Sequence, residues 1–477
     1  MTERLVISWL AMALACLAPT IVRGETPAAK EKDPTVKLVL KPAALARASL
    51  KYQLLPRAVI DQKPGNAAVH YGKVMMLWPQ KDREKRDQKV ADWLDVPLDK
   101  LPRQEVATVL REYKSVLNEA DRAARREQCD WDLPVREGNI FAMLLPELSN
   151  LRSLGRVVAL KARLEIAEGH LDDAIHTLQN GFAIARHAAQ GRTLINGLVG
   201  IAIADMMSQR VREFIQQPAS PNLYWGLTML PRPLIDMRPG VECEMQAVRL
   251  MFPGFSDIDE KHRDLAYWQR WLDDFYRTMQ DLMGGPDAPK AGWGPAMTAL
   301  ALKGYPQAKQ TLIAEGRSPQ EVEAMPVPEV VVMYTLRTYE ELRDRVFQWF
   351  FVPYWEARAG LAAADQYIRT EGRDREIVPL ASLLLPAISR VAFVSARGDR
   401  TIAALRTVEA IRLYGVAHGV RLPEKLADIR EVPLPIDPTT GQLFQYRVAG
   451  AVATLESPGA PGQQSQDVLR WEIHFVP

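Results

Sequence analysis

The fold class of this chain is decided by Ala167-Glu-Gly-His-Leu-Asp-Asp-Ala-Ile-His-Thr-Leu-Gln-Asn-Gly-Phe182. The first residues end one amphipathic helix, Gly169 marks a tight turn, and apolar residues at helical spacing begin a second helix. The two helices are therefore expected to return against each other as a hairpin. Amphipathic helices joined by Gly- and Pro-marked turns recur along the chain, so we predict a mainly α fold built from helical hairpins.

The second helix of this hairpin carries small and apolar residues in a pattern that a repeat family shares. These positions are Gly169, Leu171, Ala174, Ile175, Leu178, Gly181 and Phe182. Residues 160–187 resemble a tetratricopeptide hairpin, in which small residues let paired helices approach closely. The resemblance implies a tetratricopeptide-like array of helical hairpins. It covers about one repeat: Arg186 stands where the family has its closing proline, and no clear second copy follows at an offset of roughly 34 residues.

Further helical patterns surround the hairpin. Apolar stripes predict helices over residues 104–127, 144–168, 171–190 and 194–215. The last of these contains Gly197–Ala204, which is apolar on all sides but shorter than the roughly 20 residues of a membrane span. We therefore expect a buried core helix there and no integral membrane segment in the mature protein.

The composition places the chain among globular proteins. It has 477 residues, of which 47% are hydrophobic and 25% are charged, and its net charge is +2 from 60 basic and 58 acidic side chains. This length allows two or three hydrophobic cores. The balanced charge gives no sign of the clustered basic surface that binds nucleic acid.

The N-terminal residues have the pattern of a targeting segment. Arg4 precedes the uncharged apolar run Leu5–Ala18, and small residues near Gly24 suit signal peptidase. We predict a cleaved signal peptide and a periplasmic or secreted protein. The alternative is a lipid anchor on Cys16, although Ala13 stands where lipoprotein signals usually carry leucine.

Composition shifts suggest the organisation of the rest of the chain. We predict a signal peptide at 1–24, a flexible leader at 25–42, an N-terminal helical-hairpin domain at 43–220, a second helical domain at 221–397 and a C-terminal module at 398–477.

After signal cleavage two cysteines remain, Cys129 and Cys243. Two separate thiols are the favoured interpretation, and a single bridge between them stays open because connectivity cannot be deduced from sequence.

The C-terminal module has the most specific pattern. A helix over 399–417 is followed by Leu422-Pro423, the loop Asp437–Gly441, and three short β-like runs at 444–448, 451–456 and 471–475. Residues 399–477 resemble the globular end of the major pseudopilins of type II secretion systems, which implies a small α+β module. The family's apolar helix stands at the start of its chains and is internal here, so we do not expect assembly into a fibre. Some relatives bind calcium in this loop, but Asp437 is the only obvious carboxylate here, and calcium takes about six or more oxygens.

Together, an exported helical chain and this tail resemble uncharacterised secreted bacterial proteins, and no activity follows from that resemblance.

Two aromatic stretches are candidates for ligand contact. Tyr224 and Trp225 stand near Arg232 and Arg238, and aromatic faces with guanidinium groups could line a groove; a buried helix connection is the favoured alternative. The second stretch concentrates aromatic residues around Pro353. Core packing is favoured over a carbohydrate or peptide platform, because Phe347, Phe350, Phe351 and Tyr354 share one helical face.

No sequence motif for catalysis, cofactor or metal binding was found, so none of these residues is assigned such a role. Polar residues gather around the hairpin turn, and we interpret them as turn capping, because His170 and His176 would lie on opposite sides of a helix. The full group is Glu165, Glu168, His170, Asp172, Asp173 and His176.

Two functions are consistent with these patterns. The favoured one is an interaction scaffold of the cell envelope, in which stacked hairpins offer a concave surface to a protein or peptide partner. The alternative is a hydrolase of an envelope or polysaccharide substrate, which would use carboxylates such as Glu242 in an aromatic groove.

Overall fold

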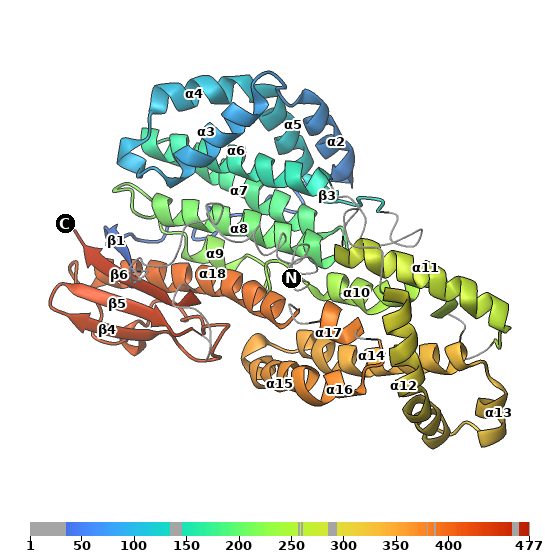
Figure 1. The fold of residues 1–477 in the computed structure, drawn as a ribbon. Coiled ribbons are helices and arrows are strands. Elements are labelled where there is room, and N and C mark those ends of the chain that lie inside the picture. The colour runs from blue at the N-terminus through green and yellow to red at the C-terminus, as the bar shows by residue number, and fades with distance from the viewer. Residues whose placement is uncertain are drawn as a thin grey trace, which may run out of the picture. The chain divides into compact units, whose positions relative to one another are not determined.

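The structure is a computed structural model that describes residues 35–133, 146–255, 258, 261–284, 293–378, 380–385, 388–459 and 467–476. The expected signal peptide, residues 1–24, lies outside this part of the chain. The described fold is mainly helical with a small sheet near the C-terminus (Figure 1), which confirms the predicted fold class at that level.

The described residues form two compact units. A mixed unit contains residues 35–132, 146–237, 393–459 and 467–476, and a helical unit contains residues 238–392. This division differs from the expected consecutive domains 43–220, 221–397 and 398–477. The reason is long-range pairing, because the strand near residue 36 joins the C-terminal sheet and the C-terminal segment packs with the first half of the chain.

The mixed unit consists of helices around a long hairpin, together with the sheet. In chain order its helices and short strands are β2 (Lys63–Asn66), α2 (Ala67–Leu77), α3 (Arg83–Asp95), η1 (Leu98–Lys100), α4 (Arg103–Glu112), α5 (Lys114–Ala124), β3 (Arg126–Gln128), α6 (Pro146–Glu168), α7 (Leu171–Ala189), α8 (Leu194–Phe214), α9 (Tyr224–Thr228), α18 (Ile388–Ala417, from residue 393) and η6 (Leu426–Asp428). β2 and β3 pair in parallel.

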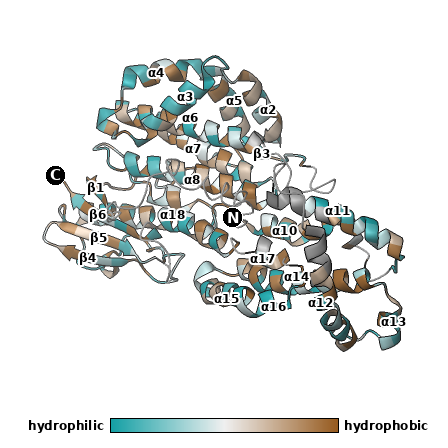
Figure 2. Ribbon diagram, in the orientation of Figure 1, coloured by the Kyte–Doolittle hydropathy of each residue, from teal (hydrophilic) through white to brown (hydrophobic). Residues whose placement is uncertain are grey.

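The predicted hairpin is confirmed as α6 and α7. Gly169 joins them with a φ of 79°, a left-handed conformation that glycine adopts without strain. α7 packs against both α6 and α8 (Figure 1). α3 and α4 are largely hydrophilic, whereas α8 has a long apolar stretch (Figure 2).

The apolar run of α8 lies in the core, as expected. Gly197–Ile201 is buried throughout, and Ile203 and Ala204 are buried as well. Within the described residues, no helix combines the length and the apolar character that crossing a membrane requires.

The helix expected over 104–127 is interrupted at Tyr113, where α4 ends and α5 begins. The backbone of Tyr113 is not helical (φ −88°, ψ 6°). Its ring is fully buried against Trp78, and its hydroxyl donates to Asp87 Oδ1 at 3.0 Å. The break therefore lets one large side chain join the core while its hydroxyl keeps a partner.

A four-stranded sheet has the order β1-β6-β5-β4. β4 (Gln445–Ala449), β5 (Val452–Ser457) and β6 (Leu469–Phe475) are antiparallel and confirm the three predicted β-runs. The prediction of a flexible leader over 25–42 is wrong for β1 (Val36–Leu40), which pairs with β6 in parallel. Leu38 and Leu40 on one face of β1 are fully buried, and their burial holds the strand in place.

The helical unit contains the remaining elements: α10 (Arg238–Met251), η3 (Pro253–Phe255), α11 (Leu265–Gly284), α12 (Trp293–Ala314), α13 (Pro319–Ala324), α14 (Val327–Phe347), η4 (Gln348–Phe351), α15 (Tyr354–Tyr367), η5 (Ile368–Gly372), α16 (Arg373–Arg375) and α17 (Leu380–Leu384).

The expectation of core packing around Pro353 is only partly met. Phe347 is buried, but Phe351 is 50% exposed, and Phe350 and Tyr354 are half-buried. The α-helix ends at Phe347, and the tighter turn η4 follows before α15 begins. The four rings therefore do not share the single helical face that the spacing suggested.

The close approach of α7 and α8 at Gly200 gives a prediction for protein stability. A Cβ at Gly200 would lie 2.6 Å from the backbone oxygen of Ala185, which cannot move without shifting the helix. We expect Gly200→Ala to lower the free energy of unfolding by about 1–3 kcal/mol in urea titrations. The matched control is Gly72→Ala in α2, where nothing lies within 4 Å, and it should raise that free energy by about 0.5–1 kcal/mol. Effects of the same sign in both variants would contradict this account of the packing.

Candidate functional site

The four residues predicted to line a groove differ in their burial. Tyr224 is 1% exposed and lies in the core of the mixed unit, so it cannot line an open groove. Its hydroxyl donates to the backbone oxygen of Pro433, and the guanidinium of Arg406 lies 5.6 Å from the centre of its ring. Burial of the aromatic ring, the alternative favoured from the sequence, describes Tyr224 correctly.

The other three predicted groove residues are half-buried or exposed. Trp225 is half-buried and packs edge-on against Tyr224, with ring centroids 5.2 Å apart. Arg232 is exposed in the mixed unit, whereas Arg238 begins α10 of the helical unit. All four residues are described, and none of them lines either cavity discussed below.

Some of the polar residues predicted to cap the hairpin turn do lie at the turn, whereas His176 contacts another helix. Glu168 and His170 lie near each other, with Oε2 and Nδ1 3.5 Å apart, and Asp172 and Asp173 occupy the first turn of α7. In the described residues, no three His, Cys, Asp or Glu side chains converge as a metal site. His176 instead contacts Asp121 of α5, a partner that the sequence did not suggest.

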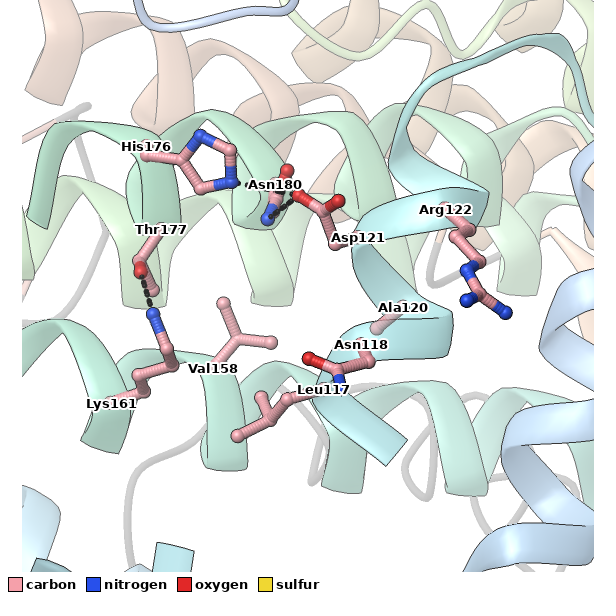
Figure 3. A pocket seen from close by; sticks show the side chains of 10 residues that line it. All are labelled: Leu117, Asn118, Ala120, Asp121, Arg122, Val158, Lys161, His176, Thr177 and Asn180. Carbon is pink, nitrogen blue, oxygen red and sulfur yellow. Dashed lines mark hydrogen bonds and ion pairs between the residues drawn. The ribbon is translucent and has the colours of Figure 1, made fainter. Parts of the chain in front are cut away.

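A polar cavity of about 400 Å³ surrounds this meeting point, between α5, α6 and α7 (Figure 3). The lining residues are Leu117, Asn118, Ala120, Asp121, Arg122, Val158, Lys161, His176, Thr177 and Asn180. Asn118, Arg122 and His176 are exposed, so the cavity is reached from the surface. Its position on the predicted hairpin makes it the candidate functional site.

One end of the cavity is a hydrogen-bond network around Asp121. His176 and Asn180 point toward this carboxylate (Figure 3), with His176 Nε2 at 2.8 Å and Asn180 Nδ2 at 2.9 Å from Asp121 Oδ1. Arg125 Nη2 lies 3.1 Å from His176 Nδ1. A guanidinium group can only donate, so His176 Nδ1 accepts from Arg125 in this contact, while Nε2 lies against the carboxylate of Asp121.

This network fixes the ionisation of Asp121. Burial alone would raise the pKa of its carboxyl, but the hydrogen bonds from His176 and Asn180 and the charge of Arg125 outweigh burial and lower the pKa to about 2. Asp121 therefore carries a negative charge at neutral and mildly acidic pH.

The other end of the cavity is Lys161 of α6. Its ammonium group donates to Glu165 one turn further on, and to Thr177 Oγ1 of α7 at 2.6 Å (Figure 3). Glu165 and Thr177 thereby hold the positive charge in position.

The helical unit has an apolar cavity of about 180 Å³ between α11, α12 and α14. Aromatic side chains of Trp271 and Phe275 line it, and Leu302 at its edge is 65% exposed. No charged side chain is among its described lining residues. Because a few placed polar groups are what orient a ligand, the polar cavity of the mixed unit is the stronger candidate for a selective site.

The remaining sequence candidates lie elsewhere. Cys129 is buried, Cys243 is half-buried, and no disulfide joins them. Burial raises the pKa of the Cys129 thiol well above its usual range, which disfavours the thiolate form. Glu242 is exposed on α10 and lines neither cavity. The carboxylate of Asp437 accepts from the backbone N–H and the hydroxyl of Thr439, at 2.8 and 2.7 Å, and so stabilises its own turn.

Comparison with protein-family models, with curated proteins and with solved structures found no match to this chain.

Proposed function

We propose that this protein is an exported helical scaffold that binds a peptide, or an extended segment of a protein partner, in the cavity between α5, α6 and α7. The observation that carries the proposal is the cavity itself. Its volume of about 400 Å³ lies within the range of about 300–1,000 Å³ that is typical of ligand pockets, and it has charged groups at two ends.

The state of His176 supports recognition rather than catalysis. A general base needs a ring nitrogen that can take a proton from the substrate. Both ring nitrogens of His176 are engaged, Nε2 with Asp121 and Nδ1 with Arg125. The same contacts favour one orientation of the His176 ring at the cavity, and a preoriented side chain loses less entropy on binding.

The hairpin architecture is consistent with a scaffold. α6, α7 and α8 pack against one another in sequence, and small residues let them approach: a Cβ at Gly181 would lie 2.0 Å from Met207 Sδ. We propose on this basis that the hairpin is tetratricopeptide-like, since stacked helix pairs of that kind present concave binding surfaces.

The C-terminal module is proposed to be pseudopilin-like. The long helix α18 precedes the antiparallel strands β4, β5 and β6, as the sequence resemblance implies. β1 is an addition that this resemblance does not include. The module would then act as a structural part of the mixed unit.

Export is proposed from the N-terminal sequence alone. Arg4 followed by the apolar run Leu5–Ala18 supports a cleaved signal and a periplasmic or secreted location. A lipid anchor on Cys16 is the alternative, and the mass of the mature N-terminal peptide distinguishes the two.

Peptide binding is testable with a variant that fills the cavity. Dodecapeptides selected from a random displayed library on the purified chain should bind saturably in calorimetry. Asn118→Trp places a large ring at the mouth of the cavity, and it should weaken these peptides by about tenfold or more, which corresponds to about 1.4 kcal/mol.

The control for this variant is Ser115→Trp. Ser115 is exposed on the same helix and does not line the cavity, so its replacement should change the affinity less than about twofold, or about 0.4 kcal/mol. If the peptides bind the parent protein, Asn118→Trp and Ser115→Trp with equal affinity, the binding site lies elsewhere and the proposed site is refuted.

A further inference from the structure

We infer that the cavity selects a ligand segment with two opposite charges, a cationic group that meets Asp121 and an anionic group that meets Lys161. This inference rests on the proposed function and names the chemical class of the ligand. It follows from the hydrogen-bonding capacity that the two side chains retain.

Asp121 uses only one of its two carboxylate oxygens. Oδ1 accepts from His176 and Asn180, and Arg125 Nε approaches it at 3.4 Å. Oδ2 accepts no hydrogen bond from the described residues. Because the carboxyl pKa is about 2, this oxygen carries negative charge and is suited to an ammonium or guanidinium group.

Lys161 retains one donor. An ammonium group has three N–H bonds, and the described residues accept two of them, at Glu165 and at Thr177. The third N–H is left for a ligand, since the Lys161 side chain is 34% exposed and lines the cavity. A carboxylate is the partner that forms the strongest hydrogen bond with such a group.

Two residues of α7 contact the two charged side chains. Lys161 is held by Thr177, and Asp121 is held by Asn180, which stands one helical turn further along α7. Cβ atoms three positions apart on a helix are separated by about 5–6 Å. In an extended peptide, side chains two positions apart point to the same side at about 7 Å along the chain. A basic and an acidic residue two positions apart in an extended segment would present both charges to the same side, and this is the spacing that the peptides below use.

Repulsion would exclude segments with two charges of one sign. Two acidic side chains would bring one carboxylate against Asp121, and two basic ones would bring an ammonium group against Lys161. Like charges in a partly buried site cost affinity, so the cavity should discriminate against both kinds of segment.

A set of blocked synthetic heptapeptides tests the inference. All are acetylated and amidated, and positions 3 and 5 are Lys/Glu, Glu/Lys, Lys/Lys, Glu/Glu or Gln/Gln on otherwise identical backgrounds taken from the selected peptides. One of the two mixed-charge orders should bind at least about tenfold more tightly than Lys/Lys and Glu/Glu, a difference of about 1.4 kcal/mol.

Two variants that each remove one charge from the cavity then test which end of the cavity meets which charge of the peptide. Asp121→Asn should weaken the mixed-charge peptide, and replacing the peptide's lysine by glutamine should remove that effect. Lys161→Met should behave in the same way toward the peptide's glutamate. Unfolding curves of both variants confirm that they are folded at the temperature of measurement. Each variant is also measured against the peptide charge assigned to the other end of the cavity, where its effect should be the same for charged and neutral peptides.

The outcomes separate this inference from the proposed function. Peptides that bind regardless of their charge, yet still lose affinity with Asn118→Trp, would overturn the charge selection and leave the binding site standing. A loss with Asp121→Asn that is equal for charged and neutral peptides would also overturn it. Failure of every peptide to bind would overturn both proposals.

Discussion

Replacing Arg412 by methionine is expected to lower the free energy of unfolding by about 3–5 kcal/mol, the usual cost of removing one partner of a buried ion pair. Arg412 and Glu409 on α18 are both 0% exposed, with Nη1 and Oε1 2.8 Å apart. The remaining donors of Arg412 hold two other segments, since Nε donates to Lys41 O at 2.9 Å and Nη2 donates to Ser220 O at 3.0 Å. The variant would leave the Glu409 carboxylate buried without its cation.

Glu409 gives this prediction a pH signature. Burial raises the pKa of its carboxyl, and Arg412 opposes that rise. Without Arg412 the folded-state pKa should rise further above the unfolded value, so the folded variant binds a proton more tightly than the unfolded chain does. The stability gap between Arg412→Met and the parent protein should therefore narrow as the pH falls, and widen as it rises.

A surface ion pair is the matched control. Arg447 and Glu456 lie 3.3 Å apart across β4 and β5, and the side chain of Arg447 is 65% exposed. Arg447→Met should cost less than about 1 kcal/mol in the same urea titrations. A cost for Arg412→Met as small as that for Arg447→Met would show that the buried pair does not hold the C-terminal helix to the rest of the mixed unit.

Local sequence patterns predicted the elements whose signals lie within a few residues. Gly169 is expected at a turn from the sequence, and it has a positive φ in the structure. The three C-terminal strands were also predicted, because their alternation is visible in the sequence and turn residues separate them. In each case the physical cause acts between near neighbours in the chain.

Features that depend on distant residues were missed. β1 lies in a segment rich in charged residues and proline, and only its pairing with β6 makes it a strand. The alternation of Leu38 and Leu40 with exposed residues was the one signal that could have revealed it.

The candidate site was missed for the same reason. His176 was assigned to the turn, and its partner Asp121 is 55 residues away on another helix. Sequence spacing showed correctly that His170 and His176 do not form a pair, but it held no information on which helix would face His176. Within the predicted groove, composition makes Tyr224 look like a binding residue, whereas its ring is buried by packing.

His187 should make the stability of the protein fall in mild acid. Its side chain is 5% exposed; Nδ1 lies 2.9 Å from the hydroxyl of Tyr71, and Nε2 lies 3.2 Å from the backbone oxygen of Arg126. Burial lowers the pKa of His187 to about 4, although the hydrogen bond to Arg126 acts in the opposite direction. The folded state thus holds a neutral imidazole where the unfolded chain would hold a charged one.

The sign of the effect follows from the two pKa values. Above about pH 6.5 the imidazole is neutral in both states, and the full stability is present. Below that pH the unfolded chain binds a proton that the folded protein does not bind until about pH 4, so stability is lost as the pH falls between these values. At about 1.4 kcal/mol per pH unit, the loss from this residue approaches about 3 kcal/mol, and it is measured by urea unfolding at half-unit steps of pH.

The contribution of His187 is separated from that of other titrating groups by how steeply the unfolding free energy changes with pH, rather than by its value at one pH. His187→Gln removes the titrating ring, so between about pH 6.5 and pH 4 its unfolding free energy should fall less steeply than that of the parent protein. His418→Gln is the matched control, because it makes the same replacement at a ring that is 45% exposed and stacks on Tyr414. Equal slopes for the parent protein and His187→Gln would mean that the buried imidazole is not what makes the fold acid-sensitive. A flattened slope in His187→Gln alone would assign that sensitivity to the contact of α7 with Tyr71 of α2.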